Sequence, residues 1–307
     1  MMQAKRRPGV RNRGRVVRRA FKVGEIDCEI DCLDSDGPGE ATGGAGGAAV
    51  VLVPGQWSSK YDPLLMAIGE GVLRRNAEDE DGTKLQVVRM TFTTRWSEPF
   101  SGYHKEKKEL INVISYLRGR MGLDVVGVVG HSKAASVVAL AMSELNPEPS
   151  SPETFGVVCV SGRFNMAEGV ERSIGQEVVD LVMASNQPQL IGVEKRQPFW
   201  LTKEMLEERA SIDMGLAIKN MKRNLSRPEG STRKVVLLVA HGDCDERIPV
   251  EAAASYVEAF REGGEGNDGE DSEIQLIRHA DHCFTNPEHR GELVRHIVRF
   301  IRDKVLG

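Results

Sequence analysis

The fold is decided by the stretch Val125-Val126-Gly127-Val128-Val129-Gly130-His131-Ser132-Lys133-Ala134-Ala135-Ser136-Val137-Val138-Ala139-Leu140-Ala141. Its first residues are apolar or glycine, which is typical of a strand buried on both faces of a parallel sheet. The residues after Ser132 are small and apolar, and they suit a buried helix. Gly130-x-Ser132-x-Ala134 is a common pattern by chance, but between a strand and a helix it predicts a nucleophile elbow. Such a strained turn lifts a serine hydroxyl above the carboxyl end of the sheet.

The rest of the chain alternates strand and helix patterns around this stretch. Residues 15–33 predict two strands, and buried strands follow at 48–53, 85–92, 155–160, 235–240 and 273–278. Helices are expected at 62–75, 103–121, 250–261 and 287–305. This alternation predicts one α/β domain over residues 1–307, built on a mostly parallel sheet covered on both faces. Residues 163–230 interrupt the alternation with charged helical patterns, and we interpret them as a small helical cap.

Charge is spread unevenly along the 307 residues. Residues 1–20 hold eight Lys or Arg and no acid, so that the net charge of −4 leaves −12 for the remainder. The acidic remainder argues against nucleic acid as a partner. We expect residues 1–14 to form a disordered basic tail, with the remnant of an organelle-targeting segment as the alternative. The longest apolar runs, such as Val235 to Ala240, are too short to span a bilayer.

Five cysteines are scattered along the chain, at Cys28, Cys32, Cys159, Cys244 and Cys283. Their odd number and irregular spacing indicate no disulfide framework, which favours a reducing compartment. Cys244 and Cys283, together with His241 and His279, lack the paired spacing of a zinc site. The sequence therefore predicts no metal and no cofactor.

The activation of a serine nucleophile requires a base that takes its proton and a carboxylate that orients the base. In this architecture the acid and then the histidine follow later in the chain, each just past a strand. The segment His241-Gly242-Asp243-Cys244-Asp245 follows one buried strand, and His279-Ala280-Asp281-His282 follows the last. We predict a triad of Ser132, Asp245 and His282, with Asp243 as the alternative acid and His279 as the alternative base. His131 is expected to pack or to bond to a neighbouring strand.

Four segments of the chain resemble a known family: Pro54-Gly55-Gln56, Gly130-His131-Ser132-Lys133-Ala134, His241-Gly242-x-x-Asp245 and Ala280-Asp281-His282-Cys283-Phe284. They are similar to the α/β-hydrolase fold, a mostly parallel sheet with helices on both faces and an inserted cap. The resemblance is to esterase and serine-aminopeptidase-like hydrolases of plants and algae. The last segment also resembles the ending of bacterial cinnamoyl and feruloyl esterases. This spacing favours Asp245 over Asp243.

The resemblance implies an oxyanion hole made of the backbone N–H groups of Gln56 and Lys133. Pro54 stands where many relatives carry histidine, and Ala134 replaces the usual glycine. A third departure is the segment at residues 93–97, where relatives often have a glycine-rich loop, and it leaves the shape of one wall of the site open. Trp57, Phe199 and Trp200 are candidates for lining an acyl pocket, and they serve equally well as anchors of the cap.

These patterns predict a serine hydrolase that cleaves a small carboxylic ester through an acyl-enzyme intermediate. A thioesterase and an aminopeptidase-like amide hydrolase are alternatives that use the same machinery. A non-catalytic ligand-binding receptor is the alternative from another class, and the complete triad disfavours it. We expect a cytoplasmic protein, or an organellar one such as a chloroplast protein if the tail is a targeting remnant. The sequence leaves the oligomeric state, the acyl group and the leaving group open.

Overall fold

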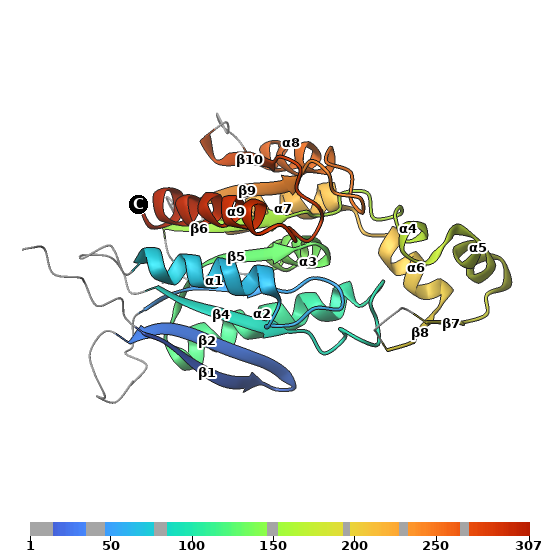
Figure 1. The fold of residues 1–307 in the computed structure, drawn as a ribbon, viewed down its shortest axis with the longest axis horizontal. Helices are drawn as coiled ribbons and strands as arrows, with labels where there is room; N and C mark the ends of the chain where they lie inside the picture. Colours follow the sequence, from blue (N-terminus) through green and yellow to red (C-terminus); the bar gives the residue numbers. More distant parts are fainter. Residues whose placement is uncertain are drawn as a thin grey trace, which may run out of the picture.

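The elbow strand lies inside an eight-stranded sheet (Figure 1). A computed structural model describes residues 15–34, 47–76, 85–145, 153–192, 197–226, 233–264 and 270–307. The basic tail predicted over residues 1–14 lies outside this part of the chain. The sheet has the strand order β1-β2-β4-β3-β5-β6-β9-β10. The strands are β1 (Arg15–Val23), β2 (Ile26–Asp34), β3 (Ala48–Val53), β4 (Leu85–Thr91), β5 (Asp124–His131), β6 (Thr154–Val160), β9 (Lys234–Gly242) and β10 (Ser272–Ile277).

Strand direction confirms the predicted, mostly parallel sheet. Strand β2 is antiparallel to both of its neighbours, β1 and β4, and the other adjacent pairs are parallel. The parallel strands β3, β5 and β9 consist largely of Val, Leu, Ala and Gly with almost every residue buried, because helices cover both faces of the sheet. The edge strand β10 alternates buried and more exposed residues instead. The carboxyl ends of β5, β9 and β10 therefore meet at one edge of the sheet, where the three predicted triad residues follow them.

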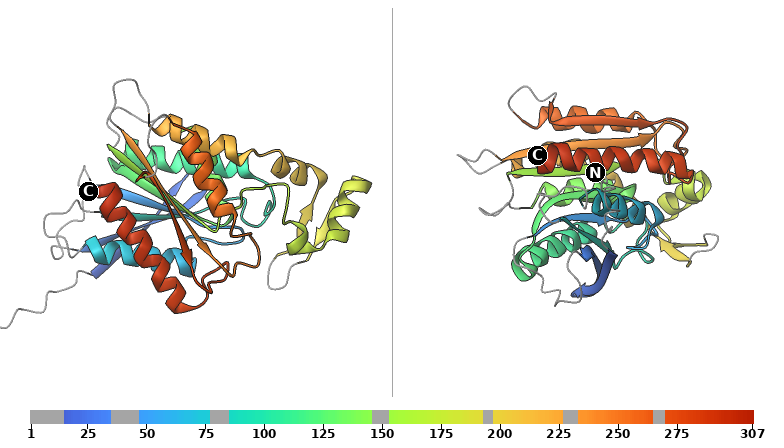
Figure 2. Two further views of the ribbon diagram at one scale, coloured as in Figure 1. Left: turned by 90° about the horizontal axis from the view of Figure 1, so that it is seen from above. Right: turned by 60° about the vertical axis from the view of Figure 1, so that its left-hand side comes forward.

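Two helical layers enclose the sheet (Figure 2). One apolar cluster joins the sheet to α2 (Tyr103–Met121), α3 (Lys133–Met142), α7 (Met214–Leu225) and α8 (Ala252–Glu262). The other joins it to α1 (Pro63–Asn76), α9 (Pro287–Phe300) and the π-helix η2 (Ile301–Leu306). Within the described ranges, no helix has both the length and the apolar composition that a bilayer span requires.

The π-helix η2 packs directly on the middle of the sheet because two paired glycines leave room for it there. Gly127 of β5 is paired with Gly156 of β6. A Cβ atom on Gly156 would lie 2.5 Å from a methyl carbon of Val305 in η2. The missing side chain lets η2 pack against the backbone of the sheet.

The stretch predicted as a cap, residues 163–230, has two parts. Helix α7 packs against α3 and α8 in the main body. The preceding elements extend away from the sheet (Figure 1). They are α4 (Glu171–Ile174), α5 (Gln176–Ser185), β7 (Gln189–Ile191), β8 (Phe199–Leu201) and α6 (Lys203–Ala210). Residues 193–196 and 227–230 of this stretch lie outside the described ranges.

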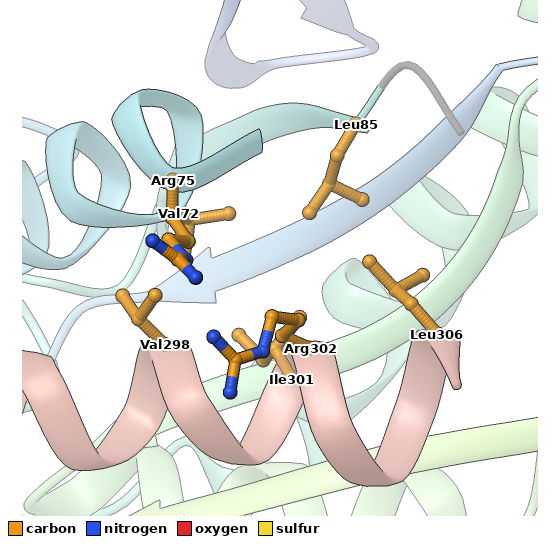
Figure 3. A pocket seen from close by; sticks show the side chains of 7 residues that line it. All are labelled: Val72, Arg75, Leu85, Val298, Ile301, Arg302 and Leu306. Carbon is orange, nitrogen blue, oxygen red and sulfur yellow. The ribbon is translucent and has the colours of Figure 1, made fainter. Parts of the chain in front are cut away.

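A recess on the main body is lined by side chains of α1, β4, α9 and η2 (Figure 3). Val72, Leu85 and Ile301 contribute to it, and its volume is about 20 Å³. A water molecule needs about 10–15 Å³ of such volume. The recess is therefore too small for a substrate of the predicted kind.

Candidate active site

Ser132 occupies the turn between β5 and α3, where the elbow was predicted. Its backbone has φ 59° and ψ −123°, a combination that L residues rarely adopt outside functional turns. Its N–H donates to the main-chain oxygen of Val160 at 2.8 Å, which ties the turn to the neighbouring strand β6. A Cβ atom on Gly130 would lie 2.5 Å from the main-chain oxygen of Ala134. The tight turn therefore needs a glycine at position 130, whereas Ala134 is accommodated and fully buried.

The structure brings the three predicted triad residues into one hydrogen-bonded chain. His282 Nε2 lies 2.8 Å from Ser132 Oγ. On the other side of the ring, Nδ1 lies 2.7 Å from Asp245 Oδ2. These contacts join residues that are 150 and 37 positions apart in the sequence. The arrangement has the form in which an imidazole takes a proton from a hydroxyl while a carboxylate holds its tautomer.

The Asp245 side chain is fully buried. Burial alone would raise the pKa of this carboxyl group, because it disfavours the charged form. Hydrogen bonds from His241 and His282, and one from the N–H of Ile248, outweigh burial and hold the pKa of Asp245 well below its ordinary value. Asp245 is therefore ionised at neutral pH and can stabilise positive charge on the His282 ring.

A second histidine reaches the same carboxylate, and sequence reasoning missed it. His241 Nε2 lies 3.2 Å from Asp245 Oδ2 and 3.2 Å from the main-chain oxygen of Ile248. The ring is fully buried, and its Nδ1 atom has no hydrogen-bond partner among the described residues. Sequence analysis had weighed His241 only as a metal ligand. The four-residue spacing between His241 and Asp245 was the available signal.

His131, just before Ser132, is buried and bonds to the loop that carries His282 rather than to an adjacent strand. Its Nε2 atom lies 2.9 Å from the main-chain oxygen of His282. Complete burial lowers the pKa of His131 to about 4. The ring is therefore neutral at pH 7 and donates its single proton to that oxygen.

The rival residues are close to the triad but outside its hydrogen-bonded chain. Asp243 accepts a hydrogen bond from the backbone N–H of His279 at 2.5 Å, and both residues are exposed. The possible ligand atoms of Asp243, Cys244 and His279 lie within 4.8 Å of one another. The loops after β9 and β10 thus bring His279 next to the adjacent residues Asp243 and Cys244, although His279 is 36 positions from Asp243 in the sequence.

Comparisons with known proteins agree with this architecture. The sequence profile of the prolyl oligopeptidase family matches residues 178–307, which include Asp245 and His282 but not Ser132. No curated protein sequence matches the chain significantly. Est1E from Butyrivibrio proteoclasticus is structurally similar, with a TM-score of 0.65, 12% identity, and coverage of 94% of this chain and 99% of that one. The chain has the α/β-hydrolase fold.

Other solved structures share the fold at similarly low identity. The esterase domain of a Rhodothermus marinus protein gives a TM-score of 0.58 at 14% identity, covering 95% of this chain and 100% of that one. An esterase from Pyrococcus furiosus gives a TM-score of 0.59 at 13% identity, with coverage of 96% of this chain and 92% of that one. Est1E with ferulic acid bound gives 0.61 at 13% identity, covering 94% and 100%.

The two residues expected to form an oxyanion hole are Lys133, which follows Ser132 in the chain, and Gln56, which follows a glycine that approaches Ser132. Lys133 opens helix α3, where the first N–H groups have no partner within the helix. Gln56 follows Gly55, whose added Cβ atom would lie 3.2 Å from Ser132 Cβ and 2.9 Å from the main-chain oxygen of His131. Gly55 thus lets the chain before Gln56 approach Ser132 closely.

An aromatic cluster joins the α/β-hydrolase body to the projecting elements. The ring centroid of Trp57 lies 5.6 Å from that of Phe100 and 6.2 Å from that of Phe199. Phe100 and Phe199 are 5.7 Å apart. Trp200 does not join this cluster: it is 56% exposed and pairs across the β7–β8 ribbon with Leu190. Successive residues of a strand point to opposite faces, so Phe199 and Trp200 cannot line the same pocket wall.

Proposed function

We propose that this chain is a serine hydrolase that cleaves a small carboxylic ester through an acyl-enzyme intermediate. The observation that carries the proposal is the chain of contacts from Ser132 Oγ through His282 to the buried carboxylate of Asp245. A serine in this setting has a base for its proton and a turn that exposes its hydroxyl.

The geometry supports the following order of steps. Ser132 Oγ attacks the ester carbonyl carbon while His282 Nε2 takes the hydroxyl proton. The carbonyl oxygen becomes an oxyanion, which the backbone N–H groups of Gln56 and Lys133 stabilise, typically by about 3 kcal/mol for each donor. His282 then returns the proton to the leaving alcohol. Water enters, gives its proton to His282 and attacks the acyl carbon, which releases the acid and restores the serine.

The acyl group we propose is short or aromatic. The cluster of Trp57, Phe100 and Phe199 supports an aromatic wall, and a fold relative binds ferulic acid, an aromatic acid. The segment 163–230 mixes charges with apolar residues, which does not suit a broad apolar lid for an oil surface. We expect turnover of acyl chains up to about C8, within a pocket of a few hundred Å³.

Hydrolysis of a peptide bond is a second candidate, favoured by the match of residues 178–307 to the prolyl oligopeptidase family. The same triad serves both reactions, since amide and ester differ in the leaving group. A panel of p-nitrophenyl esters, thioesters and aminoacyl p-nitroanilides separates the ester, thioester and amide candidates by their kcat/KM.

A fluorophosphonate probe tests whether the serine is activated. The protein should be labelled at Ser132, and the Ser132→Ala variant should remain folded by circular dichroism and unlabelled. Ser136→Ala is a matched control, because this serine lies in the first turn of α3, is buried, and its hydroxyl is paired with Arg163 and Tyr256 rather than with His282. Labelling of Ser132→Ala at the wild-type rate contradicts the proposal.

A further inference from the structure

The side chain of the residue after the nucleophile is part of a buried network of its own. Lys133 Nζ donates to the main-chain oxygen of Ser101 at 2.6 Å, to Glu106 Oε1 at 2.7 Å and to the main-chain oxygen of Glu98 at 3.1 Å. An ammonium group has three protons, so all of them are used. The side chain is only 5% exposed. Its position is therefore fixed by three contacts rather than by solvent.

Glu106, the partner of Lys133, also belongs to this network. Its side chain is 3% exposed, and Oε1 accepts a second hydrogen bond from Thr94 Oγ1 at 2.5 Å. Lys133 and Glu106 thus hold the segment from Thr94 to Ser101 at three of its residues. This segment includes residues 94–97 of the loop whose shape the sequence left open.

The same segment carries Phe100, a buried member of the aromatic cluster that we propose as one wall of the acyl site. Phe100 contacts Trp57 and Phe199 through its ring, and Phe199 belongs to the projecting strand β8. The N–H of Gly102, at the end of the segment, lies 3.4 Å from a carboxylate oxygen of Glu208 in α6. Lys133 is therefore connected through one loop to the aromatic cluster, which includes Phe199 of β8, and to helix α6.

We propose that the Lys133 side chain and Glu106 are positioning residues that set the acyl specificity of the site by fixing Phe100. The proposal rests on the proposed esterase function. A buried ion pair contributes little net stability compared with apolar residues of similar volume. Its effect is on the position of the groups that it holds. Here these groups are the main chain on both sides of Phe100, between Glu98 and Ser101.

A second ion pair on the same helix provides a matched control. Lys107 Nζ lies 2.5 Å from Glu144 Oε1, and the Lys107 side chain is 8% exposed. This pair joins α2 to the residues after α3. Among the described residues, neither Lys107 nor Glu144 has a side-chain hydrogen bond to the segment from Thr94 to Ser101. Glu144→Gln therefore removes the carboxylate of a Lys–Glu pair on the same helix, here from a side chain that is 55% exposed, without reaching the aromatic cluster.

The experiment compares kcat/KM for p-nitrophenyl 3-phenylpropanoate and p-nitrophenyl acetate in the full chain. In Glu106→Gln we expect the ratio of the two values to fall about tenfold, mainly through KM for the aromatic ester, which corresponds to about 1.4 kcal/mol. In Glu144→Gln the ratio should stay within about twofold of wild type. Thr94→Val, which removes one hydrogen bond to Glu106, should lower the ratio in the same direction by a smaller factor.

A double-mutant cycle connects the effect to the wall. Phe100→Ala should lower the ratio as Glu106→Gln does, and the two changes together should give no further loss, because both act on one contact. Equal loss with both esters in Glu106→Gln, or additive effects in the double variant, overturns the inference. If Glu106→Gln does not fold, the same comparison is made with Thr94→Val, Phe100→Ala and their double variant. Equal loss with both esters in Thr94→Val, or additive effects in that double variant, then overturns the inference. A wild-type protein that hydrolyses neither ester contradicts the proposed function instead.

Discussion

His131 Nε2 donates a hydrogen bond to the main-chain oxygen of His282 at 2.9 Å. The residue before the proposed nucleophile thus holds the loop that carries the proposed base. The ring centroids of the two histidines are 5.2 Å apart. The elbow and the histidine loop follow strands that are not neighbours in the sheet, so this bond is a direct connection between them.

The burial of His131 predicts a pH-dependent stability. Its pKa is lowered to about 4 in the folded protein, against about 6.5 in the unfolded chain. Between these values the unfolded chain binds a proton that the folded state does not, so the free energy of unfolding falls as the pH falls. From about pH 7.5 to about pH 5.5, we expect His131 to contribute a loss of about 1 kcal/mol. Urea unfolding at both pH values measures it.

The His131→Gln variant isolates this contribution. It should be less stable than wild type at about pH 7.5, but its stability should fall by about 1 kcal/mol less on acidification. His104→Gln is the control, since His104 is exposed on α2. If the free energy of unfolding of His131→Gln falls as much between the two pH values as that of wild type, then His131 does not cause the loss of stability.

Asp245 and Asp243 provide a test of the proposed acid. Asp245→Asn should lower kcat by about 10⁴-fold, because the amide favours the wrong tautomer of the histidine. Asp243→Asn should change kcat by less than about tenfold, since its carboxylate contacts the His279 backbone rather than His282. Steady-state kinetics with p-nitrophenyl acetate distinguishes them. A larger loss in Asp243→Asn would contradict the assignment.

Phe199 and Trp200 are adjacent, yet we expect them to differ in function. Phe199→Leu removes an aromatic contact of about 1 kcal/mol and should lower kcat/KM for p-nitrophenyl 3-phenylpropanoate several-fold. Trp200 lies on the exposed face of β8, so Trp200→Leu should leave kcat/KM for the same ester within about twofold of wild type. The reverse order would place Trp200, and not Phe199, against the substrate.

The elbow should tolerate a glycine at position 134 but no alanine at position 130. Gly130→Ala places a methyl group 2.5 Å from the main-chain oxygen of Ala134 and should destabilise the protein by roughly 1–3 kcal/mol. Ala134→Gly opens no steric conflict and should retain fluorophosphonate labelling. Thermal unfolding and probe labelling measure the two effects. Normal labelling and stability in Gly130→Ala would mean that the turn is wider than the structure shows.

Most parallel strands could be located from the sequence, in their order along the chain, because buried strands are continuous apolar runs, as in residues 48–53. The proposed positions of Ser132 and Asp245 each follow such a run, whereas His282 follows the alternating strand β10. The partners of His241 and Lys133 were not predictable in this way. The Lys133 side chain contacts segments that are distant in sequence, whereas the contacts of His241 lie within its own loop, at Asp245 and Ile248. No periodicity encodes which carbonyl oxygen a buried ammonium or imidazole will meet. Trp200 was grouped with Phe199 because the short strand β8 is too brief to show alternation.

The proposed base depends on the outermost strand of the sheet. Strand β10, which leads to His282, pairs with β9 alone, whereas β5 is paired on both sides. Edge strands separate more readily than central ones, since fewer backbone hydrogen bonds hold them. On warming, β10 should detach before the central strands and carry the imidazole away while the serine turn stays intact. Heat inactivation should therefore precede loss of the sheet, and it should reverse on cooling for as long as the central strands remain paired.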